Sequence, residues 1–341
     1  MFSNKSNNVI VSLTTYSKRA NTVHKTIISL LNQTATIDKI ILWLDKDEFT
    51  LKTLPKDLAE LQGEVFNIEF CENTKSFKKL IPTLEKYPEA NIVTVDDDFI
   101  YPSTLIESLL EYNAKFPGCV IGARGRVMRV EYGEIKPYPD WQFVQLQHGI
   151  KSSHALIPIG YAGILYPVNS LHRDVFKKDL YTKLCPTADD LWFKAMAMLQ
   201  GTATVIMPLE KTNGMKPIEG TQDEALYLTH NAGDANTNQM KAIVSHYPKL
   251  KKCFKDDLFS ECSIDGYSFV KEINAQKRQQ SHSKIEAGVS QAVNEIRESA
   301  ILLEKKNLRL AFSLMKVAAL IRPNGPLINK KLSEYKAKLM K

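Results

Sequence analysis

The chain has 341 residues, of which 44% are hydrophobic and 24% are charged, and its net charge is +7. This composition is typical of a soluble globular protein, and no stretch approaches the roughly 20 apolar residues of a membrane span. The N-terminal stretch lacks the features of a signal peptide, and the five scattered cysteines form no CxxC pair. These features predict a cytoplasmic protein without a zinc site or a disulfide framework. The moderate positive charge favours anionic ligands, but no nucleic-acid partner is expected.

Hydrophobic patterns in the first hundred residues alternate between two periods. Alternating or continuous apolar runs predict strands at 8–16, 38–45, 64–71 and 91–95, and apolar residues at helical spacing predict helices at 22–34 and 76–88. Strands and helices that alternate at this spacing indicate a parallel sheet with helices on both faces. The nearly continuous apolar runs at 38–45 and 91–95 favour strands buried on both sides.

Polar side chains follow three of these predicted strands. They are Thr14, Thr15 and Tyr16 after the first, Asp45 after the second, and Asp96, Asp97 and Asp98 after the run at 91–95. In open parallel sheets, ligands bind beyond the carboxyl ends of the strands, so these residues are predicted to share one crevice. Three adjacent acids repel one another and require lysines, arginines or a metal ion nearby. A single Asp here would be a cap for the helix that begins near Ser103, but three in a row favour a ligand or metal site.

The pattern resembles the GT-A glycosyltransferases, of the family 2 type that acts in bacterial capsule and lipopolysaccharide synthesis. The segments that carry the resemblance are VSLTTYSKRANTVHKTIISLLNQT, KIILWLD, VDDDFIYP, GYAGILYP and PTADDLWF. It covers about residues 8–235 and implies a Rossmann-like, mostly parallel sheet flanked by helices in a domain of residues 1–270. In this comparison Asp96 and Asp98 correspond to the two aspartates of the family's D-x-D motif.

The resemblance also implies a donor site for a nucleotide sugar, by default a UDP-sugar. A Mn²⁺ or Mg²⁺ ion would bridge the diphosphate oxygens, with Asp98 as its direct ligand and Asp96 on the ribose hydroxyls or a coordinated water. Asp97 is grouped with the nucleotide-sugar site, although it would point the other way and can be structural. The remaining donor residues would be Thr14, Tyr16 and Arg19 along the nucleotide, Asp45 at the base and Lys79 near the phosphates. For Lys79, a solvated helix face is an equal alternative.

Asp189 and Asp190 open a predicted helix in the second half of the domain. By resemblance to inverting enzymes, Asp190 would be the general base that deprotonates the acceptor hydroxyl, and Asp189 would support it. The family usually carries Glu-Asp at this place, so the pair departs mildly from the pattern. Acids in the first turn of a helix also complement its dipole, and capping remains an alternative.

Further residues on the acceptor side carry weaker signals. Gly160 and Gly163 would let the backbone approach a sugar, or they mark a bulged strand. Trp141 would stack on an acceptor sugar, or it packs in the core. His230 would close the metal site, as a histidine after the base helix does in several such enzymes, or it is structural.

Residues 271–341 differ in composition from the rest and show helical periodicity. The pattern resembles a single tetratricopeptide-like unit, which cannot bury its apolar face alone. This C-terminal helical extension should pack on the catalytic domain, on a second subunit in a homo-oligomer, or on a partner. Its lysines would permit peripheral contact with the inner face of the membrane, but a solvated basic face is the simpler explanation.

Together these features predict a metal-dependent hexosyltransferase that moves a sugar from a nucleotide-sugar donor to a glycan or glycolipid acceptor with inversion. The chain lacks the Q-x-x-R-W stretch of processive synthases. Two alternatives are a non-catalytic sugar- or nucleotide-binding module and a metal-dependent nucleotidyltransferase. The acidic pair Asp189 and Asp190 disfavours the first, and the absence of glycine from TTYSKRANT disfavours the second.

Overall fold

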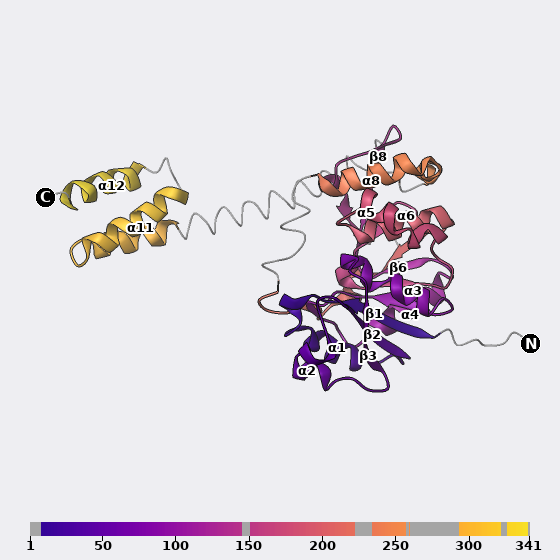
Figure 1. Cartoon of the computed structure of the whole chain (residues 1–341). Coiled ribbons are helices and arrows are strands. Elements are labelled where there is room, and N and C mark those ends of the chain that lie inside the picture. The colour runs from indigo at the N-terminus through magenta and orange to yellow at the C-terminus, as the bar shows by residue number, and fades with distance from the viewer. Residues whose placement is uncertain are drawn as a thin grey trace, which may run out of the picture. The chain divides into compact units, whose positions relative to one another are not determined.

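The computed structural model describes residues 8–144, 151–221, 234–256, 259, 293–321 and 326–339. The chain forms two compact units, Met1–Ser263 and Ile264–Lys341, which are described separately below (Figure 1). The division falls slightly earlier than the predicted boundary after residue 270.

A seven-stranded sheet forms the centre of the first unit, in the order β13-β6-β12-β4-β1-β2-β3. β12 runs antiparallel to both of its neighbours, and all other neighbouring pairs are parallel. The predicted α/β class with a mostly parallel sheet is therefore confirmed. The strands are β1 (Val9–Thr14), β2 (Lys39–Asp45), β3 (Phe66–Cys71), β4 (Asn91–Thr94), β6 (Val120–Gly122), β12 (Ile164–Tyr166) and β13 (Thr204–Ile206).

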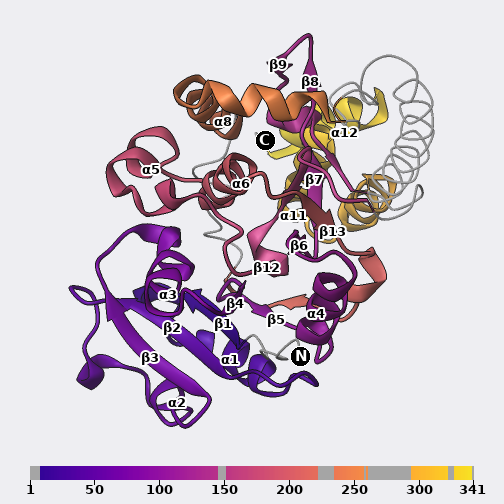
Figure 2. The same ribbon diagram turned by 90° about the vertical axis from the view of Figure 1, so that its right-hand side faces the viewer.

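Helices cover both faces of this sheet (Figure 2). Helices α1 (Val23–Leu31), α2 (Lys56–Ala59) and α4 (Leu105–Lys115) pack on one face. Helices α3 (Ile81–Lys86), α5 (Lys178–Leu184), α6 (Asp189–Gln200) and α8 (Ala235–His246), with the 3₁₀ segment η8 (Pro248–Lys255), contribute to the other. Adjacent residues of β4 enter opposite cores. Val93 lies in the first core, on the face covered by α1, α2 and α4, and Ile92 lies in the second core, on the face covered by α3, α5, α6 and α8. The strand is therefore buried on both sides, as its apolar run predicted.

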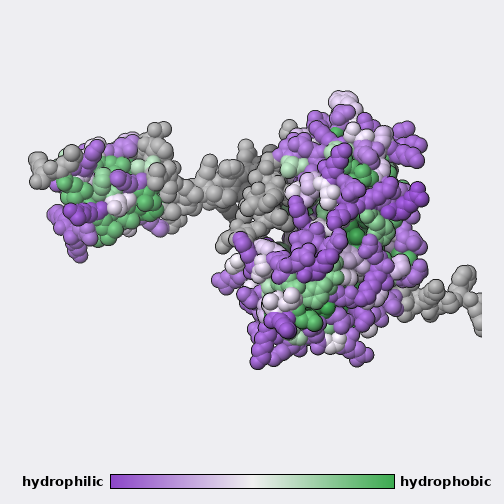
Figure 3. All heavy atoms as spheres, viewed as in Figure 1, coloured by the Kyte–Doolittle hydropathy of each residue, from purple (hydrophilic) through white to green (hydrophobic). Residues whose placement is uncertain are grey.

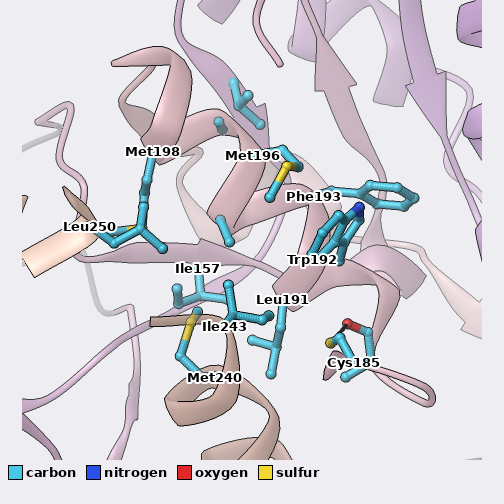
Figure 4. Packing of buried hydrophobic residues seen from close by; sticks show 14 of the residues in the cluster. Ile157, Cys185, Leu191, Trp192, Phe193, Met196, Met198, Met240, Ile243 and Leu250 are labelled. Atoms are coloured by element: carbon cyan, nitrogen blue, oxygen red, sulfur yellow. Dashed lines mark hydrogen bonds between the residues drawn. The ribbon is translucent and has the colours of Figure 1, made fainter. Parts of the chain in front are cut away.

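α6 is the centre of the second core (Figure 4). Its side chains Leu191, Trp192 and Met196 lie among residues of α8 and of the strand β11 (Leu156–Pro158), and all three are buried. The helix ends at Gly201, whose φ of 82° is left-handed and suits glycine. The first turn of α6, which carries Asp189 and Asp190, is thus held by a helix that is packed along its length.

The predicted helix at 76–88 divides into two pieces in the structure. Residues Lys75–Lys79 form a 3₁₀ segment, η3, and α3 begins only at Ile81. Pro82 lies in the first turn of α3, where its missing N–H costs no hydrogen bond.

Smaller elements occupy the segments between the main strands. A three-stranded sheet consists of β10 (Gln142–Phe143), β7 (Gly125–Val127) and β11 (Leu156–Pro158). Two further strand pairs are β5 (Phe99–Ile100) with β14 (Lys216–Pro217) and β8 (Val130–Glu131) with β9 (Glu134–Ile135). The remaining elements are the 3₁₀ segments η1 (Ser17–Arg19), η2 (Leu51–Thr53), η4 (Tyr138–Asp140), η5 (Gly160–Ala162), η6 (Arg173–Phe176) and η7 (Leu209–Thr212).

The second unit is helical, as predicted. Residues 293–303 are helical and are followed by α11 (Leu308–Ile321) and α12 (Pro326–Leu339). A small core of Ala300, Ala311, Met315 and Tyr335 lies between them. Across the described ranges of both units, the helices are too short or too polar to span a bilayer.

Candidate functional site

The polar ends of the parallel strands meet at one edge of the sheet. β4 leads directly into Asp96, Asp97 and Asp98, and its neighbour β1 leads into Thr15. Because β12 runs in the opposite direction, the segment before it, η5, lies at this same edge. The predicted crevice residues from the first and fourth strands are therefore close together, and η5 joins them.

Lys79 lies at the centre of an acidic cluster. Its Nζ is 2.9 Å from Asp189 Oδ2, 3.1 Å from Asp96 Oδ1 and 3.4 Å from Asp190 Oδ1. Only 5% of the Lys79 side chain is exposed. Burial alone would lower the pKa of this amine, but the three carboxylates outweigh burial and raise it well above its usual value. Lys79 is thus a permanent cation that joins the acids of β4 to those of α6, and the solvated-face alternative is wrong.

The aromatic anchor Phe77 explains why Lys79 points inward. The Phe77 ring stacks on Tyr181 of α5 with centroids 4.3 Å apart and meets Phe193 of α6 edge-on at 5.7 Å. These contacts fix the 3₁₀ segment η3 against the helices that carry the acidic pair. Lys79, two residues later, is directed at the first turn of α6.

The Asp190 side chain is partly exposed to solvent and lies close to several charged groups. Its side chain is 26% exposed, and its Oδ2 accepts a hydrogen bond of 2.7 Å from the backbone N–H of Gly160. Burial, followed by repulsion from Asp189 and Asp96, raises the pKa of Asp190 to about 7, although Lys79 and the Gly160 N–H oppose the rise. A carboxylate that titrates near neutral pH and reaches solvent has the properties of a general base.

Gly160 has no room for a side chain. A Cβ at this position would lie 2.5 Å from Lys79 Nζ and 2.6 Å from Asp190 Oδ1. The absent side chain therefore permits the backbone N–H to reach Asp190 while Lys79 contacts the same carboxylate. Gly163 serves packing instead, because its φ is +103° and a Cβ there would meet Leu105 of α4 at 3.3 Å.

A second cation, Arg19, neutralises the other two acids of the triplet. Its Nη1 is 2.8 Å from Asp97 Oδ1 and 3.0 Å from Asp98 Oδ2, and its Nη2 donates to the carbonyl oxygen of Thr221. Thr15 donates a 2.5 Å hydrogen bond to Asp97 Oδ2. Burial raises the pKa of Asp97 despite these partners. Asp97 therefore connects the ends of β1 and β4, in agreement with a structural role.

Tyr101 holds the backbone of the acidic segment in place. Its hydroxyl accepts from the Asp96 N–H at 3.0 Å and lies 2.8 Å from the carbonyl oxygen of Tyr161 in η5. Burial raises the pKa of this phenol well above its usual value, so it stays neutral and can donate. The tyrosine of the sequence DDDFIYP is thus a link between Asp96 and η5.

Asp189 and Asp190 lie in the first turn of α6, where acids complement the helix dipole, but neither is the N-cap of the helix. The N-cap of α6 is Ala188, and Asp189 and Asp190 are directed at Lys79 and Gly160. The N-cap of α4 is Thr104, which follows the acidic triplet by several residues. The five carboxylates converge on two cations, buried Lys79 and half-buried Arg19.

Other predicted donor-site residues lie at the same edge of the sheet with different partners. Tyr16 lies under the Arg19 guanidinium, which is 5.6 Å from the ring centroid. Thr14 donates to the carbonyl oxygen of Trp43, and Asp45 accepts from the N–H of Asp47 in the turn after β2. Among the residues that the structure describes, no contact joins Thr14 or Asp45 to the Lys79 cluster.

Trp141 does not offer a face to an acceptor. The side chain is fully buried, and its Nε1 donates to the carbonyl oxygen of Lys136. Its ring packs against Tyr138 with centroids 5.0 Å apart. The packing interpretation therefore describes Trp141, and the predicted sugar contact is not formed in this arrangement. His230 lies outside the described residues.

The acids differ in their suitability for a divalent cation. Asp96 is the most exposed member of the triplet, with 34% of its side chain accessible, whereas Asp98 is 8% exposed and contacts Arg19. Within the described ranges, no three His, Cys, Asp or Glu side chains are spaced to enclose a metal ion. Mg²⁺ sites of the kind completed by substrate phosphates and water need only one or two carboxylates. The excess of five carboxylates over two cations fits such an ion, with Asp96 as the accessible ligand rather than Asp98.

Pattern reasoning missed several functional contacts. It did not connect Lys79 with Asp189 and Asp190, and it gave no role to Tyr101. The signal for Tyr101 was its place three residues after the acidic triplet. Lys79 and Asp190 are 111 positions apart, so no local pattern could have joined them.

Comparison of the chain with models of known protein families and with curated proteins yields no match.

Proposed function

We propose that this protein is a glycosyltransferase that uses a nucleotide-sugar donor, in the manner of the GT-A enzymes that its motifs resemble. The observation that carries the proposal is the cluster of Asp96, Asp189 and Asp190 around buried Lys79, at the edge of the sheet where the parallel strands end. Open α/β sheets bind ligands at that edge. The cluster contains an accessible carboxylate whose pKa is raised to about 7.

Asp190 is the proposed general base. Its carboxylate takes the proton of an acceptor hydroxyl as that oxygen attacks the anomeric carbon, and the bond from the sugar to the nucleoside diphosphate breaks. Lys79 opposes the rise in the pKa of Asp190 and fixes its position together with the Gly160 N–H. Asp189 in turn holds Lys79. One base on the face opposite the leaving group corresponds to inversion at the sugar.

The donor is proposed to bind beside Asp96 and Tyr16, with Mn²⁺ or Mg²⁺ held by Asp96. When bound, this ion would supply a Lewis acid that stabilises the charge on the departing diphosphate. Asp98 and Asp97 hold Arg19, which orders the loop after β1. UDP is the proposed nucleotide, and the acceptor is a glycan or glycolipid of a surface polysaccharide. The four described cysteines are unpaired, which suits a reducing cytoplasm.

A panel of nucleotide sugars incubated with the protein and Mn²⁺ tests the proposal. The expected product is free nucleoside diphosphate, and its amount should rise when an oligosaccharide acceptor is added. Release of pyrophosphate from a nucleoside triphosphate and a sugar phosphate would instead identify a nucleotidyltransferase. Saturable donor binding without release of product would identify a binding module.

A further inference from the structure

The C-terminal helical unit carries the whole charge imbalance of the chain. Residues 293–341 contain eleven lysines and arginines but only four glutamates and no aspartate. The preceding 292 residues contain 34 basic and 34 acidic residues. The net charge of +7 is therefore a property of this unit alone, and it is available for a partner of opposite charge.

Two glutamates of the described part of the unit, Glu304 and Glu334, are already paired with lysines. Glu304 accepts from Lys331 at 2.9 Å and from Lys338 at 2.6 Å, and Lys331 also contacts Glu334 at 3.1 Å. These contacts tie α12 to the turn before α11.

A groove of about 510 Å³ lies between α11 and α12. Its lining consists of Phe312 and Lys316 from α11 and of Leu332, Ser333, Lys336 and Leu339 from α12. The groove is apolar with two lysines, and Lys316 Nζ lies 4.8 Å from the centroid of the Phe312 ring. Neither Lys316 nor Lys336 forms a salt bridge with a carboxylate of the described residues. Figure 3 shows hydrophobic residues at the surface of this unit beside hydrophilic ones.

We infer that this groove binds an acidic amphipathic peptide segment of a partner protein, with apolar side chains against Phe312, Leu332 and Leu339 and carboxylates on Lys316 and Lys336. Charge complementarity favours an acidic occupant, and the apolar floor favours one that also brings hydrophobic anchors. A peptide can insert side chains into a groove between helices, whereas a bilayer surface meets only the protruding residues of a protein. The partner is therefore proposed to be a protein rather than lipid.

Fluorescence anisotropy with the full chain and labelled synthetic peptides tests the inference. The probe is a helix-forming peptide of glutamate and leucine, about 16 residues long, with leucines at i, i+3, i+4 and i+7. Two companion peptides replace its leucines by serine or its glutamates by lysine. Only the first is expected to bind, and its affinity should fall as salt is raised. Failure of the glutamate–leucine peptide to bind, or equal binding of the serine version, would overturn the inference.

Charge reversal locates the binding site. Lys316→Glu with Lys336→Glu should weaken binding of the peptide by about tenfold or more, since each attraction becomes a repulsion. The matched control is Lys305→Glu with Lys306→Glu, which makes the same charge change at exposed lysines outside the groove and should change affinity by less than about twofold. Circular dichroism melting would verify that both variants fold.

Flotation with anionic vesicles of phosphatidylglycerol and phosphatidylcholine tests whether the groove binds a membrane instead of a peptide. Lysine-dependent binding to vesicles in the absence of peptide binding would mean that the groove serves a membrane and would contradict the inference. If the groove variant and the control lost affinity for the peptide equally, the binding would be unspecific electrostatic attraction, and this result would also contradict the inference.

Discussion

At the scale of single residues, the account depends on the protonation of Asp190. Burial and two neighbouring acids raise its pKa to about 7. A base works only when deprotonated, so turnover should rise with pH through about 7 and level off above it. Rate measurements between pH 5.5 and 8.5 at fixed donor and acceptor concentrations would reveal this limb. A rate that falls across the same range would mean that the titrating group acts as an acid.

Replacement of Asp190 by Asn should remove the pH-dependent limb and lower turnover by roughly a hundredfold or more, because the amide cannot accept the proton. Donor affinity should change little, since Asp190 faces the acceptor in the proposed arrangement. The control is Asp179→Asn on the exposed surface of α5, which should be neutral. Near-normal turnover of the Asp190 variant would transfer the role to Asp189.

Lys79 should be more important for stability than an ordinary lysine. Lys79→Met leaves three clustered carboxylates without their cation, and loss of one partner of a buried pair costs about 3–5 kcal/mol. Lys79 opposes the raised pKa of Asp190, so its loss should raise that pKa further above the unfolded value, and the variant retains stability at low pH and loses it as pH rises. Urea unfolding at pH 5 and pH 8 would measure this difference.

The comparison for Lys79 is Lys86→Met. Lys86 contacts Glu69 at 2.6 Å but is 47% exposed, and an exposed pair contributes at most about 1 kcal/mol. If Lys79→Met were no more destabilising than Lys86→Met, or lost the same stability at both pH values, the electrostatic description of the cluster would be wrong.

At the scale of elements, η5 is the piece whose backbone completes the site. Gly160→Ala places a Cβ 2.5 Å from Lys79 Nζ and 2.6 Å from Asp190 Oδ1. Both atoms are ends of side chains that can move, so the fold should survive while the Lys79–Asp190 geometry does not. Turnover should fall by about tenfold or more, because small displacements of a catalytic group are costly.

Gly63→Ala is the matched control, since no atom lies within 4 Å of the added Cβ. Thermal unfolding of both variants would separate loss of the fold from loss of the site. A Gly160→Ala protein with normal turnover would show that the contact between η5 and Asp190 is not needed for the reaction.

The strands of the first hundred residues were predictable from sequence because they are short apolar or alternating runs, as in KIILWLD of β2. The main-sheet strands β6 and β13, of three residues each, were not predicted. The strands β5, β8, β9, β10 and β14 are two residues long, too short to give a period. The break between η3 and α3 was missed because Leu80, Ile81 and Leu84 continue the helical spacing of Phe77. The order of strands and acids along the sequence predicted that the acids lie at the sheet edge. Their pairing with Lys79 and Arg19 depends on tertiary packing and could not be predicted from the sequence.

At the scale of the whole molecule, the chain divides into a charge-balanced α/β unit and a basic helical unit. The residues of the proposed active site all belong to the first. Deletion of residues from about 275 onward should therefore change solubility or oligomeric state more than hydrolysis of the donor. Light scattering after size exclusion would report the assembly, and nucleotide release would report the chemistry. A truncated protein that keeps its mass per particle but loses hydrolysis would place the helical unit in the active site.

The central claim is that Asp190 serves as base in transfer from a nucleotide sugar. Its most direct test is the release of nucleoside diphosphate from a panel of donors with Mn²⁺ and an oligosaccharide acceptor, measured in parallel for the native chain, Asp190→Asn and Asp179→Asn. The account predicts diphosphate release by the native chain and Asp179→Asn and almost none by Asp190→Asn. Release that is equal in all three proteins, or pyrophosphate as the only product from a nucleoside triphosphate and a sugar phosphate, would contradict it.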